Sequence, residues 1–138
     1  MYTIFTNNPI PQSHFAERMD CEVKWQSSPA MEVLVTARAA IRQGASLVSD
    51  PLAGVRSLSP NSPPKAFNPY VSIIVTKPQE AVDFQSVKRI DEALAVYRKN
   101  AKLRFYPHSD EAIQTFQELD MTLLVAAMPA SATDEPDE

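Results

Sequence analysis

The chain has 138 residues, of which 44% are hydrophobic and 22% are charged, with a formal net charge of −4. One domain of this length folds without a disulfide or a structural metal, and the single cysteine, Cys21, excludes an intrachain disulfide. Four acidic residues lie within residues 129–138, and the remaining acidic residues balance the 13 basic residues. A neutral domain lacks the basic field that nucleic-acid binding needs, so we expect no nucleic-acid partner.

The first residues contain no basic segment followed by a long apolar run, and no stretch reaches the length of a membrane span. We therefore expect a cytoplasmic protein without membrane association. Residues 1–128 are predicted to form a single domain. Residues 129–138 are small, polar and acidic, which predicts a disordered tail.

The N-terminal part of the chain predicts two strands. Residues 1–5 form an alternating segment that ends at Asn7-Asn8-Pro9, because asparagine favours turns and proline cannot continue a ladder of hydrogen bonds. Residues 21–25 alternate apolar and polar side chains and predict a second strand.

A helix is predicted at residues 29–43. Ser28 supplies an N-cap oxygen, Pro29 suits the first helical position, and Gly44 suits the left-handed residue after the helix. Apolar residues recur at helical spacing between these two ends.

The C-terminal half begins with Leu47-Val48, which predicts a brief buried strand, and continues into a long loop whose residues 57–69 are rich in proline and serine. Residues 71–75 form a continuous apolar run, typical of a strand buried on both faces. Asp83 and Ser109 each predict a helix start. Residues 121–126 fit either a final strand or a continuation of the last helix. The order of elements predicts an α/β fold, with a small, mostly parallel sheet sandwiched by helices in a single domain.

Familiar catalytic and cofactor motifs are absent from the sequence. The residues His14, His108 and Cys21 have no metal-ligand spacing, and a buried thiol and surface histidines are the favoured interpretation. With glycine only at positions 44 and 54, the chain has neither a dinucleotide-binding nor a phosphate-loop motif. We therefore predict no metal and no cofactor, and binding is favoured over enzymatic activity.

The segment Thr6-Asn7-Asn8 is a candidate binding site. It follows the first predicted strand, and open α/β sheets bind ligands at the carboxyl ends of their strands. A hydroxyl and two amides at this position can hold a small polar ligand. In the alternative interpretation, which is favoured, the two amides only close the turn through bonds to their own backbone.

The segment from Asp50 to Gly54 also has two interpretations. Asp50-Pro51 starts a turn, and Gly54 can take a positive φ. As a site residue, Asp50 is an acid, a base or a hydrogen-bond acceptor at the edge of a cleft, and Arg38 either pairs with it structurally or binds a carboxylate. The structural pair is the favoured interpretation. The loop at residues 57–69 either covers this cleft or is a variable insertion.

Short motifs in a fixed order resemble the GrdX family across most of residues 1–126. They are Thr6-Asn7-Asn8-Pro9, Val33 to Gly44 with Arg38, Asp50-Pro51-Leu52-Ala53-Gly54, the strand after Pro69-Tyr70, Phe84 to Tyr97, and Phe116 to Leu124. The family is associated with the glycine, sarcosine and betaine reductase system, so the resemblance implies an accessory or interaction protein that binds reductase components. A separate hypothesis is a structural remnant or a homo-oligomer: a dimerising α/β domain without chemistry, whose interface is the exposed face of the last apolar run.

An alternative from the residues is a small polar-ligand binding module, or a minor enzyme, with a sheet-end cleft. The candidate residues for binding a ligand or a partner are Thr6, Asn7, Asn8, Arg38, Asp50, Gly54 and Tyr70.

The sequence departs from the family pattern at three positions where histidines are expected. These positions hold Arg42, Ala45 and Asp50. If the histidines bind a ligand or transfer protons in relatives, this chain either lacks that function or performs it with Asp50.

Overall fold

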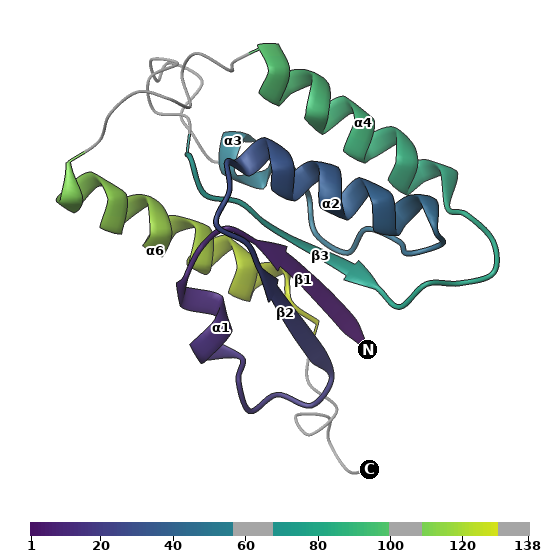
Figure 1. Ribbon diagram of the computed structural model, residues 1–138, viewed down its shortest axis with the longest axis horizontal. Coiled ribbons are helices and arrows are strands. Elements are labelled where there is room, and N and C mark those ends of the chain that lie inside the picture. Colours follow the sequence, from purple (N-terminus) through teal and green to yellow (C-terminus); the bar gives the residue numbers. More distant parts are fainter. Residues whose placement is uncertain (57–67, 100–108, 130–138) are drawn as a thin grey trace.

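A three-stranded sheet with the order β2-β1-β3 lies at the centre of the computed structural model (Figure 1). Strand β1 (Tyr2–Thr6) pairs in parallel with β2 (Cys21–Trp25) and antiparallel with β3 (Ser72–Thr76). The structure describes residues 1–56, 68–99 and 109–129. Most of the predicted 57–69 loop and nearly all of the predicted tail lie outside these ranges.

The predicted single α/β domain is confirmed, but its sheet is mixed rather than mostly parallel. Strand β3 begins beside the carboxyl end of β1, so the two strands run in opposite directions. At this end the backbone N–H of Val71 donates a hydrogen bond to Oδ1 of Asn7, at 2.9 Å. This bond holds the start of β3 at the end where β1 stops.

Helices cover both faces of the sheet (Figure 1). The helices α2 (Ala30–Arg42) and α4 (Phe84–Lys99) lie on one face, and α1 (Ile10–His14) and α6 (Asp110–Ala127) lie on the other. Residues 121–126 continue α6, which settles the choice between strand and helix for this segment. A four-residue helix, α3 (Ala53–Arg56), lies in the segment that was predicted as loop.

The core consists of two clusters separated by the sheet. Phe5 packs with α2 and α4 on one side, while its neighbour Ile4 packs with α1 and α6 on the other, as the alternation of strand side chains requires. In β3, Ile73 and Val75 face the first cluster, and Ile74 faces the second. The apolar run is thus buried on both faces, as predicted. Each fully buried aliphatic side chain stabilises the fold by roughly 1.5–3 kcal/mol.

Two of the three helix caps predicted from the sequence are confirmed, and one is wrong. Ser109 accepts a hydrogen bond from the N–H of Ala112 at 3.1 Å, and Asp83 accepts one from the N–H of Gln85 at 3.2 Å. The predicted Ser28 cap is wrong, because α2 begins after Pro29 without a side-chain cap. The Ser28 hydroxyl instead accepts a bond from the side-chain amide of Gln26 at 2.8 Å.

Two smaller expectations concern residues 47–48 and membrane association. The predicted brief buried strand at Leu47-Val48 does not form: Leu47 makes only an isolated antiparallel bridge with Val75, and Leu47 and Val48 are both half-buried. Across the described ranges, no helix combines the length and apolar character that crossing a bilayer requires.

Replacement of Gly44 by alanine is expected to destabilise the protein by roughly 2–4 kcal/mol. Gly44 has φ +113°, and a Cβ at this position would collide with the backbone carbonyl oxygen of Gln79. Gly54→Ala is the matched control, because the added Cβ has no atom within 4 Å beyond its own local backbone and neighbouring residues. Urea unfolding of both variants measures the difference. Equal stabilities would contradict this role of Gly44.

Candidate functional site

Three buried residues, Thr6, Asn8 and Asp120, and the half-buried Ser72 form a hydrogen-bonded network at the carboxyl end of β1. The Asn8 N–H donates to Oγ1 of Thr6 at 2.9 Å, and the Thr6 and Ser72 hydroxyls lie 2.8 Å apart. The Ser72 hydroxyl donates to Oδ2 of Asp120 at 2.7 Å, so Thr6 must be the donor to Ser72. The Asn8 side-chain amide also donates to Oδ2 of Asp120, at 3.0 Å. These hydrogen bonds therefore converge, directly or through Thr6 and Ser72, on the carboxyl group of Asp120.

Sheet register and helix phase bring these residues together. The antiparallel pairing of β1 with β3 places Thr6 directly opposite Ser72. On α6, Asp120 lies in the same buried stripe as Met121 and Leu124. The stripe that anchors α6 to the sheet thus also carries Asp120 to the end of the strands.

Two asparagine amides fix α6 at this position. The side-chain amide of Asn8 donates to the main-chain carbonyl of Gln117, and that of Asn68 donates to the carbonyl of Phe116, each at 3.0 Å. Both donors come from turns beside strand ends. The position of Asp120 is therefore set by main-chain contacts as well as by its own carboxyl group.

Burial dominates the electrostatics of Asp120. The residue is only 6% exposed, and desolvation raises the pKa of its carboxyl group above the ordinary value. The hydrogen bonds from Asn8 and Ser72 favour the ionised form and lower the pKa, but they offset only part of the effect of burial.

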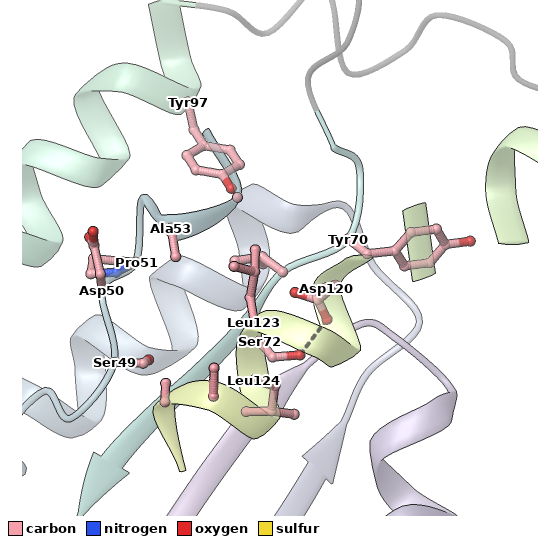
Figure 2. Close-up of a pocket in the computed structure, with 14 residues that line it drawn as sticks. Ser49, Asp50, Pro51, Ala53, Tyr70, Ser72, Tyr97, Asp120, Leu123 and Leu124 are labelled. Atoms are coloured by element: carbon pink, nitrogen blue, oxygen red, sulfur yellow. Dashed lines mark hydrogen bonds between the residues drawn. The ribbon is translucent and has the colours of Figure 1, made fainter. Parts of the chain in front are cut away.

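A cavity of about 240 Å³ lies beside this carboxyl group. It is bounded by the segment after the Leu47 bridge, the first residues of β3, the end of α4 and the last turns of α6. Figure 2 shows Asp120 and Ser72 joined on one side, with Ser49, Asp50 and Pro51 across from them. The lining residues are Ser49, Asp50, Pro51, Ala53, Gly54, Tyr70, Val71, Ser72, Tyr97, Asp120, Leu123, Leu124, Ala126 and Ala127.

Three of the residues predicted to bind a ligand or partner line the cavity directly: Asp50, Gly54 and Tyr70. The Tyr70 ring extends away from the other labelled side chains (Figure 2). Thr6 and Asn8 do not line the cavity. They form hydrogen bonds with Ser72 and Asp120, which do line it.

The hydrogen-bonding capacity of the Asn7 amide is used within the protein. Its side-chain nitrogen donates to the carbonyls of Ser28 and Pro69, each at 3.0 Å, and its oxygen accepts from Val71 N–H. Of the hydrogen bonds made by the side-chain amides of Asn7 and Asn8, one is local: the N–H of Ile10 donates to Oδ1 of Asn8 at 3.1 Å. The asparagines therefore join distant segments instead of simply closing their own turn.

The expected pairing of Arg38 with Asp50 does not form. Nε of Arg38 lies 3.3 Å from Oδ1 of Asp91, which joins α2 to α4, and Arg38 is not among the residues lining the cavity. Asp50 instead accepts a hydrogen bond from the N–H of Leu52 at 3.0 Å, as expected for a residue that starts a turn.

Asp120 was not predicted as a site residue. The signal was present, because an acidic residue lies in helical phase with the apolar positions Met121 and Leu124. Ser72 was also missed, since its contact with Asp120 depends on the register of β3. Among the described residues, no group of three His, Cys, Asp or Glu side chains is arranged to hold a metal ion.

The stability of the protein should fall as pH rises from the ordinary aspartate pKa through the raised pKa of Asp120. In this window the folded state holds a proton that the unfolded state releases, so ionisation favours unfolding. Above the raised pKa the effect is constant. In Asp120→Asn the buried charge is removed while an acceptor oxygen remains, and this part of the pH dependence should disappear. Urea unfolding of both proteins at several pH values between 4 and 8 tests this, and parallel curves would contradict it.

The site lies within a segment of the chain that matches a known protein family. A family model described as GrdX-like protein matches residues 3–129. No curated protein and no solved structure matches the chain. The matched range includes all of β1 but its first residue, the turn after β1, the described segments around the cavity and the whole of α6. The chain therefore belongs to the GrdX-like protein family.

Proposed function

We propose that this chain is an accessory protein of an amino-acid reductase system that binds a small amphipathic ligand beside Asp120. The cavity with its buried carboxyl group is the observation that carries the binding role. Membership of the GrdX-like family supports the context, because that family is associated with the glycine, sarcosine and betaine reductase system.

The size of the cavity suits a small molecule. A water molecule occupies roughly 30 Å³ in the liquid, so a cavity of about 240 Å³ has the volume of roughly eight water molecules and suits a small molecule of at least a similar number of heavy atoms. Pockets for drug-sized ligands start at roughly 300 Å³. The site therefore favours a metabolite-sized ligand over a nucleotide or a peptide.

The lining favours an amine. Its charged side chains, Asp50 and Asp120, are both acidic, and none of the described lining residues is Lys, Arg or His. An ammonium group would compensate the buried charge of Asp120, whereas a ligand carboxylate would meet no cation among the lining residues that the structure describes. Leu123, Leu124 and the neighbouring alanines offer an apolar surface for the rest of the ligand.

Three probes of equal chain length test this proposal: butylamine, butan-1-ol and butyrate. We expect butylamine to bind most tightly and butyrate most weakly, as measured by chemical-shift titration. Because an ammonium group needs the ionised carboxylate, amine affinity should rise as pH passes the raised pKa of Asp120. Asp120→Asn should weaken amine binding about tenfold or more and change alcohol binding little.

Two bulky substitutions locate the binding. Ala126→Trp fills the cavity and should abolish binding of all three probes, while Ala39→Trp on the exposed surface of α2 should not. Tightest binding of butyrate, or equal amine binding by the wild type and Asp120→Asn, would contradict the amine assignment. Failure of every probe to bind would contradict the binding role itself.

Association with the reductase is tested separately by affinity capture of the tagged full chain from its host under conditions that induce the reductase. We expect reductase subunits to be recovered in stoichiometric amounts and identified by mass spectrometry. Asp50→Ala and Ala126→Trp show whether capture depends on the cavity. Recovery of the chain alone would refute the reductase context while leaving the ligand measurements unaffected.

A further inference from the structure

Strand β2 forms an outer edge of the sheet, since the strand order is β2-β1-β3. The N–H of Tyr2 donates to the carbonyl of Asp20 at 2.8 Å, and the N–H of Gln26 donates to the carbonyl of Thr6 at 2.9 Å. Backbone groups of a strand alternate in direction along its length. The even-numbered residues of β2 therefore direct their backbone groups toward β1.

The odd-numbered residues Cys21, Val23 and Trp25 consequently direct their N–H and C=O groups outward. Within residues 1–56, 68–99 and 109–129, no hydrogen bond reaches these outward groups. Helix α1 does not cover them, because Ile10 of α1 and Phe15, the residue after the helix, pack with Cys21 on a face of the sheet. An exposed edge of this kind is a template for a further strand.

The side chains along this edge restrict which strand fits. Glu22 and Lys24 are exposed on one face of β2, and Trp25 is 44% exposed on the other. Charged side chains on an edge usually discourage pairing with unrelated strands. A partner strand must therefore place an acidic residue beside Lys24 and a basic residue beside Glu22.

We propose that a second copy of this chain adds its own β2 to this edge, antiparallel and centred on Val23, so that the two sheets become one. In this register Glu22 lies opposite Lys24 of the second copy, and Lys24 lies opposite its Glu22. Val23 lies opposite itself, with outward N–H and C=O groups on both strands, which is the geometry of a hydrogen-bonded antiparallel pair. Cys21 lies opposite Trp25 of the second copy.

Two-fold symmetry makes this strand its own complement. An isologous dimer forms each contact twice, so one favourable opposition of Glu22 and Lys24 yields two. A parallel, in-register pairing would instead place Glu22 opposite Glu22 and Lys24 opposite Lys24, which is unfavourable. The charge order of these residues therefore selects the antiparallel self-pairing.

Charge reversal and charge exchange test the register. We expect the wild type to sediment as a dimer in analytical ultracentrifugation. Lys24→Glu should raise the dimer dissociation constant about tenfold, because it places two negative charges opposite each other at both symmetry-related positions. The double variant Glu22→Lys, Lys24→Glu restores opposite charges and should restore the dimer. Lys88→Glu, on the exposed surface of α4, is the control and should sediment as the wild type does.

Amide hydrogen exchange gives a second measurement without substitution. The amides of Val23 and Trp25 should become protected as protein concentration rises, whereas that of Lys24, which faces β1, should be protected at every concentration. A monomeric wild type, or a double variant as weakened as Lys24→Glu, would overturn the proposal. Concentration-independent exchange at Val23 would also overturn it.

Discussion

The buried carboxyl group of Asp120 joins α6 to the sheet, at the carboxyl end of β1 and the start of β3. It lies on α6, yet its hydrogen bonds come from the turn after β1 and from the first residue of β3. A buried acid without donors would be costly, so α6 is stable against the sheet only where Asn8 and Ser72 reach that group. The position of the last helix, and with it one wall of the cavity, depends on these bonds together with those from Asn8 and Asn68 to the main chain of α6.

Local patterns in the sequence predicted most of the secondary structure, because they depend on neighbouring residues. The apolar run in β3, the caps at Asp83 and Ser109, and Gly44 after α2 all follow from spacing within one turn or strand. The direction of β3 could not be derived in this way. It depends on pairing between segments far apart in the sequence, such as Asn7 and Val71, which are 64 positions apart.

The same distinction applies to the candidate site. The turn at Thr6-Asn7-Asn8 was identified from its position after a strand, but what its amides bind depends on residues far away in the sequence. Arg38 and Asp50 were predicted to pair only because their charges are opposite. In the structure Arg38, on α2, instead pairs with Asp91 of α4. Asp120 carried the clearer signal, since an acid within an apolar helical stripe needs a specific partner.

The order of the strands also has a consequence for how the protein is made. Of the three strands, β1 leaves the ribosome first, but it occupies the centre of the sheet and needs partners from both sides. Its parallel partner β2 follows within 25 residues, while β3 and α6 appear much later. A nascent chain therefore exposes one side of its central strand until residues 72–76 emerge, and the cavity first exists when the final helix closes over Ser72.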